Sequence, residues 1–503
     1  MRIDLSVIFV IDRFVNKYPK FNSWMKNNIS DLCARLASIS ENRFLLIYIA
    51  TIFLICLSYC FHGLDLTDEG YALTGYQQIF NHPYSVENLF SLYNTLLIGG
   101  LWEKCFGFLG IIGYKILHAL ARTLIATIVY FILRKSVNRW MIFISFLLFV
   151  AIRGSVFSYN ISAALFSLLV VLFMYASLTK QNKWYMLIAG CIFGISVLTR
   201  MSNIALSGLI LVLIPFYIFS KNRSLTFRLL GYALLGFFSG FLLNILLIVV
   251  LGHSEVMLNG IIDTISVLSS SNSGHHLPWL LHMYGVSYAH VITAMAPLFF
   301  YPCLCYLLNR YETNKVLKIS GIMVLNILFL FLLLKHYSED TLHALCCSSF
   351  LLVLIKRNNY SPNIMYLIIL SFLMMLLFPM GSDGGFYNVG QSCLYLSFPL
   401  ALGLIWNELT LAESLASKSL RVTMLIFVSI IICSSFYESM QGTYRDEGSI
   451  IKKTNRVEQS HVLTTYTNPD KAAELDALLS HINPLVTSES ECWLIPLSRG
   501  LII

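Results

Sequence analysis

The sequence predicts an all-α membrane protein that crosses the bilayer about thirteen times. The 503 residues are 57% hydrophobic and 12% charged, whereas soluble domains carry about 25% charged residues. Apolar segments of helical length recur along the whole chain, and most basic residues flank these segments. The mean hydropathy is +0.73. A water-soluble fold cannot bury this much apolar surface, so lipid is the expected solvent.

The apolar segments divide the chain into three parts. A membrane domain is expected at 44–437, between a cytoplasmic amino-terminal segment, 1–43, and a short external tail, 438–503. The expected spans are 44–62, 108–133, 140–152, 160–178, 184–199, 203–220, 227–251, 287–308, 317–334, 341–355, 362–379, 391–407 and 420–437. The two shortest, 140–152 and 341–355, fall furthest below the roughly 20 residues that a straight crossing needs.

The basic residues set the expected orientation. With the amino terminus in the cytoplasm, Lys and Arg cluster in alternate loops, as the positive-inside rule requires. The opposite-side turns hold only Arg153, Arg200 and Lys335. The net charge of +8 therefore reflects topology. No basic run is interleaved with aromatic residues as in single-stranded nucleic-acid binding, so no nucleic-acid partner is expected.

The first external loop, 63–107, contains an acidic pair, Asp68 and Glu69, directly after Thr67. Thr67 is expected to cap a helix whose first turn holds the two acids. Four residues of this amphipathic helix would form an apolar face on the membrane surface: Tyr71, Tyr76, Ile79 and Phe80. The acids are either catalytic or simply complementary to the helix dipole.

The three cations of the short external turns each lie at the outer end of a span. Such a position suits a phosphate-binding role, because guanidinium and ammonium groups stabilise phosphate charge. It is equally typical of side chains that extend to the membrane interface or pair with a nearby acid. Both interpretations apply to Arg153, Arg200 and Lys335.

Within the second apolar segment, Lys115, His118 and Arg122 are spaced three and then four residues apart, which places them on one helix face. Ionisable groups inside a span usually face a polar cavity. The alternative is a structural pairing with acids of the first loop. A glycine-rich loop at 381–391 adds Asp383, which either lines a sugar site or belongs to a flexible turn.

The order of these features resembles the start of the GT-C superfamily of membrane glycosyltransferases. An acidic pair outside the first span is followed by an amphipathic segment, by NTLLIGGLWEKCFG, and by a long helix with Arg122. The stretches LLGFFSG and AGCIFGISVLTRMSN also look like the branch that contains lipid A aminoarabinose transferase and protein O-mannosyltransferases. The chain departs from the pattern because no Pro follows Arg200 and the tail is shorter than the soluble domain often found there.

The resemblance implies transfer of a sugar from a polyprenyl-phosphate carrier to a glycolipid, polysaccharide or protein acceptor, on the external side of a bacterial inner membrane. Asp68 would be the general base, and Glu69 would orient it or help it to hold a divalent cation. The remaining implied roles are phosphate binding by Arg200, Lys335 and Arg153, and cavity lining by Lys115, His118, Arg122 and Asp383. The rival expectation is a multi-pass transporter or lipid flippase without bond chemistry, with polar groups near the bilayer midplane.

Overall fold

A computed structural model describes residues 38–485, apart from 153–155, 271–275, 312–313, 336–338, 383, 413 and 444. Throughout the described residues the chain is helical, and isolated β-bridges are the only extended pairing. The predicted all-α class is therefore confirmed. Arg153 and Asp383 lie outside the described residues.

The helices follow one another as α3 (Glu41–Ser58), α4 (Asp68–Gln78), η2 (Pro83–Leu92), α5 (Tyr93–Phe106), η3 (Gly107–Leu109), α6 (Ile111–Leu133), α7 (Arg139–Ala151), α8 (Tyr159–Lys180), α9 (Lys183–Ser196), η4 (Met201–Val212), α10 (Leu213–Ser220), α11 (Arg223–Val250), α12 (Ser254–Ser269) and α13 (Leu277–Tyr311). They continue as α14 (Lys315–Lys335), α15 (Glu339–Ile355), η5 (Arg357–Asn359), α16 (Pro362–Leu377), α17 (Phe386–Val389), η6 (Gly390–Cys393), α18 (Ser397–Leu411), α19 (Leu415–Gln441), η7 (Ile450–Lys452), α20 (Pro469–Ile482) and η8 (Asn483–Leu485).

Eight helical segments in the described part are long and apolar enough to cross a membrane: α3, α6, α8, η4 with α10, α11, α13, α14 and α19. The other predicted spans coincide with shorter helices: α7, α9, α15, α16 and α18. Sixteen helical residues extend only about 24 Å, against a hydrocarbon core of about 30 Å. The chain is thus a multi-helix membrane protein with eight candidate spans, and the count of thirteen stays a prediction.

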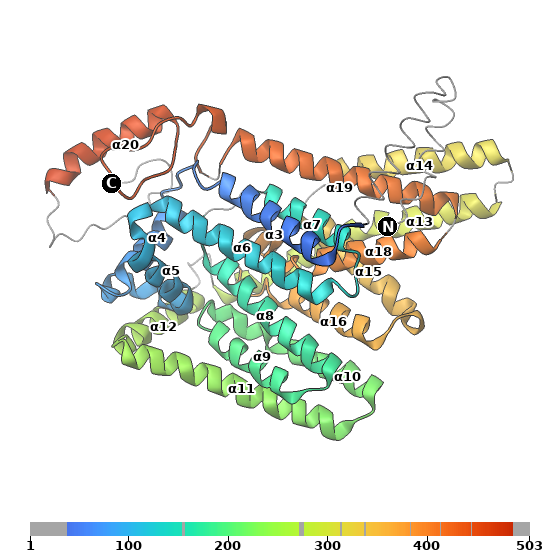
Figure 1. Cartoon of the computed structure of the whole chain (residues 1–503), viewed down its shortest axis with the longest axis horizontal. Helices are drawn as coiled ribbons and strands as arrows, with labels where there is room; N and C mark the ends of the chain where they lie inside the picture. Colours follow the sequence, from blue (N-terminus) through green and yellow to red (C-terminus); the bar gives the residue numbers. More distant parts are fainter. Residues whose placement is uncertain are drawn as a thin grey trace.

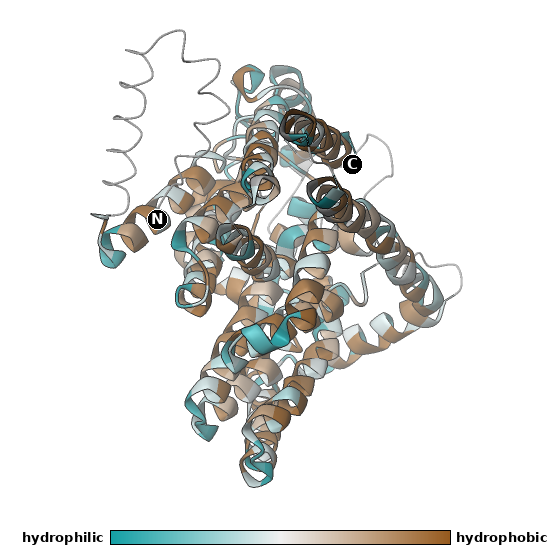
Figure 2. Ribbon diagram, turned by 90° about the vertical axis from the view of Figure 1, so that its right-hand side faces the viewer, coloured by the Kyte–Doolittle hydropathy of each residue, from teal (hydrophilic) through white to brown (hydrophobic). Residues whose placement is uncertain are grey.

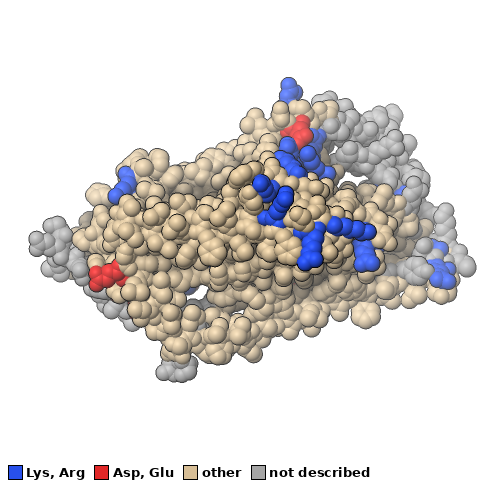
Figure 3. Space-filling model, turned by 90° about the horizontal axis from the view of Figure 1, so that it is seen from below, with Lys and Arg blue, Asp and Glu red and all other residues tan. Residues whose placement is uncertain are grey.

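Four helices that lie outside the expected spans gather at one end of the bundle (Figure 1). Figure 1 shows α4, α5, α12 and α20 together there, while α14 lies toward the opposite end. We call this the loop end, formed by residues 59–110, 251–270 and 442–485. The opposite, basic end contains the turns at 134–139, 180–183 and 221–228, which are rich in Lys and Arg. On the face seen from below, Lys and Arg gather toward one end of the molecule (Figure 3).

The surface of the bundle suits a lipid environment. Apolar residues cover most of the outward helix faces, and hydrophilic residues lie mainly at helix ends and turns (Figure 2). Only 28% of the most apolar window of α11 is buried inside the protein. In water such an apolar surface would drive aggregation, whereas in a bilayer it contacts the apolar lipid tails.

Glycines bring α9 and α11 into close contact. A Cβ added at Gly190 or Gly194 would lie well under 3.0 Å from a backbone carbonyl of α11, and one added at Gly236 or Gly240 would meet α9 in the same way. Both pairs have the four-residue spacing of a small-xxx-small crossing. These glycines lie in the two stretches, 189–203 and 234–240, that carry part of the family resemblance, so helix packing accounts for that part of the pattern.

Candidate functional site

The site begins where the chain leaves α3 and enters α4. Asp65 is buried, and its carboxylate accepts hydrogen bonds from the backbone N–H of Thr67 (2.9 Å) and of Glu69 (3.3 Å). Thr67 occupies the N-cap position but makes no side-chain cap, and its hydroxyl donates to Asp65 instead. The prediction that Thr67 is the N-cap residue is therefore confirmed for its position, but its side chain makes no capping hydrogen bond, because the carboxylate two residues earlier accepts from the free N–H groups.

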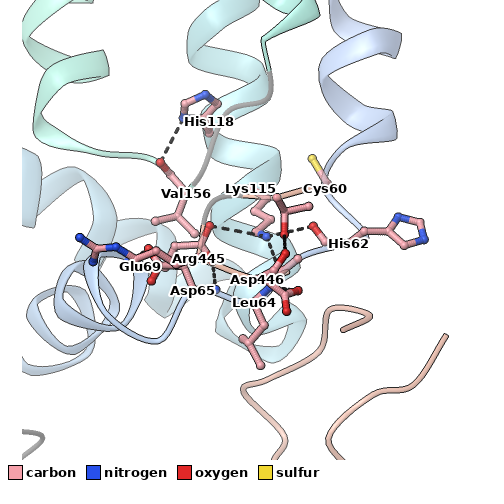
Figure 4. A network of polar contacts seen from close by, with 12 residues as sticks. Cys60, His62, Leu64, Asp65, Glu69, Lys115, His118, Val156, Arg445 and Asp446 are labelled. Carbon is pink, nitrogen blue, oxygen red and sulfur yellow. Dashed lines mark hydrogen bonds and ion pairs between the residues drawn. The ribbon is translucent and has the colours of Figure 1, made fainter. Parts of the chain in front are cut away.

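Glu69 faces inward from the same turn. It is 3% exposed, accepts a hydrogen bond from the backbone N–H of Asp65, and forms an ion pair with Lys115 at 3.6 Å. Burial raises the pKa of the Glu69 carboxyl, and Lys115 offsets that rise only in part. Lys115 also donates to the carbonyls of His62 (3.3 Å) and Gly63 (2.5 Å). Of the two interpretations of Lys115, pairing with an acid of the first loop is the one observed (Figure 4).

A third buried acid, Asp446, connects the carboxyl-terminal tail to this loop. The Asp446 carboxylate accepts hydrogen bonds from the Leu64 N–H (3.0 Å) and the Thr467 hydroxyl (2.9 Å). It forms ion pairs with Lys453 (3.1 Å) and Lys471 (3.5 Å), and the side chains of Asp446 and Lys453 are fully buried. Burial alone would raise the pKa of Asp446, but the two lysines hold it below its ordinary value. The charge is thus paired and hydrogen-bonded, as a buried carboxylate requires.

Backbone hydrogen bonds extend the same contact. The N–H of Gly63 donates to the carbonyl of Tyr466 (2.8 Å), and the N–H of Tyr466 donates to Phe61 (2.8 Å). Ile111, the first residue of α6, donates to Val462 at 2.9 Å. The Asn468 side chain caps the start of helix α20, because it accepts a hydrogen bond from the N–H of Asp470 (3.4 Å). The described part of the tail is therefore a docked element of the loop end.

This docking places a guanidinium next to the proposed base. Nη1 of Arg445 lies 2.9 Å from Oδ1 of Asp68 and also donates to the Thr67 hydroxyl. Both partners are accessible, with 44% of the Arg445 side chain and 64% of the Asp68 side chain exposed. Arg445 has φ +51°, a left-handed backbone that non-glycine residues seldom adopt. Figure 4 shows Arg445 beside Glu69 and Asp65, above the start of α6.

The prediction that α4 has an apolar face on the membrane surface is only partly correct. Tyr76 and Ile79 are buried, and the Tyr76 hydroxyl donates to the carbonyl of Phe157 at 2.6 Å. Of the four residues only Tyr71 is exposed, and Phe80 is partly buried. The prediction that Tyr76 and Ile79 lie on the membrane surface is wrong, because Gly99 and Gly100 of α5 leave room for them to pack inward.

His118 and Arg122 lie deeper along α6, on the same buried face as Lys115. Arg122 donates to the carbonyls of Phe149 and Ile152, both at 2.9 Å, and so satisfies the carboxyl-terminal end of the short helix α7. Nδ1 of His118 contacts the carbonyl of Val156 at 3.0 Å. These two residues pair with the α7–α8 connection, and among the described contacts none joins them to acids of the first loop.

Arg200 has an equivalent position at the end of another short helix. It is 6% exposed and donates to the carbonyls of Phe378 (3.2 Å) and Met380 (3.4 Å), which follow α16. Tyr284 and Tyr288 satisfy further carbonyls of the same helix end. Lys335 is the exposed last residue of α14. No described contact brings Arg200 or Lys335 to Asp68.

Sequence reasoning missed five members of this site: Asp65, Arg445, Asp446, Lys453 and Lys471. The only local signal was the charged stretch YRDEGS at 444–449, which follows an apolar segment. Among the described residues no group of three or more His, Cys, Asp and Glu side chains is arranged to hold a metal ion. Asp68 faces Arg445 and Glu69 faces Lys115, so these two acids do not fit a shared divalent cation.

The fold and this site define a helical membrane protein with a polar, tail-covered loop end. Comparison with protein-family models gives no match. Comparison with curated proteins gives no significant match either.

Proposed function

We propose that this protein is a membrane glycosyltransferase of the GT-C type, which moves a sugar from a polyprenyl-phosphate carrier to an acceptor at the loop end. In this proposal the loop end faces the outer side of a bacterial inner membrane, as the distribution of basic residues predicts. The carrier's tail stays in the bilayer, and its phosphate and sugar reach the loop end. The family resemblance supplies the reaction class.

The observation that carries the proposal is the exposed pair of Asp68 and Arg445 at 2.9 Å. A carboxylate is the group that accepts a proton from an acceptor hydroxyl, and a guanidinium is the group that binds phosphate through paired N–H donors. An exposed ion pair contributes about 0–1 kcal/mol to stability. Folding therefore does not require this contact, whereas the buried Asp65, Glu69 and Asp446 fix the backbone that presents it.

In the proposed reaction the acceptor oxygen attacks the anomeric carbon of the sugar. The bond between that carbon and the phosphate oxygen breaks, the electron pair leaves with the polyprenyl phosphate, and the acceptor proton passes to Asp68. The leaving phosphate gains charge, which Arg445 would stabilise. Binding of phosphate to Arg445 would also release Asp68 from its ion pair and leave the carboxylate ready to act as a base.

The alternative is a transporter or lipid flippase, and Arg122 is the residue that favours it. Arg122 lies eleven residues into α6, about 17 Å along the helix, which is the depth at which transporters bind substrate. Its guanidinium already satisfies two carbonyls of α7, however, so its position also has a structural reason. The enzyme proposal relies on Asp68 and Arg445, which are accessible from the loop end.

Mass spectrometry of envelope glycolipids and polysaccharides, in matched cells with and without the protein, tests the reaction class. A transferase adds the mass of one sugar residue to one acceptor only in cells that have the protein. A transporter changes the distribution of a glycolipid across the membrane without creating a new mass.

A further inference from the structure

A second polar site lies at the basic end, far from Asp68 along the chain and the fold. It is a cavity of about 280 Å³ between the start of α3, the end of α6 and the start of α7. Its polar lining consists of Glu41, Arg134, Asn138 and Arg139, and its aromatic walls are Tyr130 and Trp140. We propose that this cavity binds the phosphate of an anionic phospholipid headgroup from the leaflet at the basic end.

The depth of the cavity fits the phosphate level of a bilayer. Helix α6 has 23 residues and ends at Leu133, so it extends about 34 Å, slightly more than the hydrocarbon core of about 30 Å. Arg134 follows directly, and Glu41 is the first residue of the candidate span α3. A cavity bounded by the ends of two spans therefore opens where lipid headgroups lie, and Trp140 is of the residue type enriched at that interface.

The charge of the cavity favours an anion. The described lining residues include two arginines and one carboxylate, and the adjacent Lys135 is exposed. Nη1 of Arg134 pairs with Glu41 at 3.1 Å, in a contact where 35% and 56% of the two side chains remain accessible. A guanidinium has five N–H donors in a fixed plane, so this one contact leaves donors on Arg134 for a phosphate.

The second arginine, Arg139, is held in place by contacts with an aromatic ring and a backbone carbonyl. The Arg139 guanidinium lies 4.8 Å from the centre of the Phe44 ring and donates to the carbonyl of Ile39 at 2.8 Å. Trp140 packs edge-on against the same ring at 4.9 Å. A guanidinium fixed on an aromatic face loses less side-chain freedom when it binds a planar or tetrahedral oxyanion. The site thus joins a positioned cation to an apolar wall, which matches a phosphate attached to acyl chains.

The test uses the purified full-length protein in nanodiscs of phosphatidylcholine with increasing phosphatidylglycerol, and native mass spectrometry counts the lipid retained. Wild type should retain phosphatidylglycerol in preference to phosphatidylcholine. The double variant Arg134→Ala with Arg139→Ala should bind it about tenfold more weakly or worse. The matched control, Lys180→Ala with Lys183→Ala, removes the same charge from another turn of the basic end and should bind like wild type.

Two outcomes would overturn the proposal. Equal weakening in the arginine and lysine double variants would mean that only the general charge of the basic end attracts lipid. Equal retention of the two lipids by wild type, a measurement that does not depend on any variant folding, would remove headgroup recognition altogether. Inorganic phosphate is added as a competitor: if it binds in an arginine-dependent way while phosphatidylglycerol does not, the site takes soluble phosphate and the lipid assignment is wrong.

Discussion

Arg445 and Asp68 are 377 residues apart in the chain, and their side chains meet at 2.9 Å. The contact exists because the tail returns to the first loop and Asp446, the neighbour of Arg445, is anchored there by Leu64 and two lysines. The tail therefore contributes a cation directly to the carboxylate proposed as the base. In the proposed mechanism the tail therefore contributes a residue to the active site.

Arg445→Ala should slow sugar transfer while the tail stays docked. Removing one group that stabilises transition-state charge typically costs about 10²- to 10³-fold in rate. The measurement is the rate at which the glycosylated product forms in membranes, with protein level normalised. Lys452→Ala removes a cation from an exposed tail residue and should keep the wild-type rate. Equal rates for both variants and wild type would remove Arg445 from the mechanism.

Asp446→Asn should release the tail from the first loop. Breaking one partner of a buried ion pair typically costs about 3–5 kcal/mol, because Lys453 would remain buried without a counter-charge. Limited proteolysis should then cut within 442–485 much faster than in wild type. Glu447→Gln changes the adjacent exposed acid and should leave the cutting rate unchanged. A protease-resistant Asp446→Asn tail would mean that the backbone contacts with Tyr466 are sufficient.

Tail docking should also depend on pH in one direction. The pKa of Asp446 is lower in the folded protein than in the unfolded chain, so its stabilising effect is present above the unfolded pKa, about 3.9, and is lost as the pH falls below about 4. The N–H of Leu64 donates to Asp446. Its protection against hydrogen exchange, relative to the intrinsic rate at each pH, should therefore decrease as the pH falls through this range. The Asp446→Asn variant should show no such additional pH dependence. An acid-insensitive Leu64 amide in wild type would contradict the linkage.

The close crossing of α9 and α11 gives a prediction that is independent of function. Gly240→Ala would drive a methyl group into the carbonyl of Cys191, and such overpacking typically costs about 1–3 kcal/mol. Gly231→Ala lies on the same helix, with no atom within 4 Å of the added methyl group, and should be neutral or slightly stabilising. Thermal unfolding in detergent compares the two variants. Similar melting temperatures would show that the two helices separate at little cost.

Much of the helical layout was predictable from the sequence. Every expected apolar segment overlaps a helix in the structure. Local composition and spacing carry this information, because helices form from neighbouring residues. Thr67 is the N-cap residue of α4 as predicted, but the side chain that accepts from the first turn is Asp65, since both residues have suitable side chains and only the backbone path decides between them.

The site was predictable only in its first-loop half. Glu69 pairs with Lys115, which is one of the two interpretations that the sequence left open, and loop and helix are neighbours in the chain. The tail partners come from more than 370 residues away, and a single sequence has no periodicity that links such distant segments. Arg200 was expected at a phosphate but contacts the carbonyls of Phe378 and Met380, a role set by where α16 ends.

The central claim is that Asp68 acts as a base, and one comparison tests it most directly. Asp68→Asn keeps the size of the side chain but cannot accept a proton, so the rate of product formation should fall about 10²- to 10⁴-fold. Asp470→Asn is the matched control, because Asp470 is also an exposed acid in the first turn of a capped helix at the loop end. The account predicts a nearly inactive, normally inserted Asp68→Asn protein beside a fully active Asp470→Asn protein. Equal, mild effects of the two changes would show that Asp68 only complements a helix dipole, and would contradict the proposed mechanism.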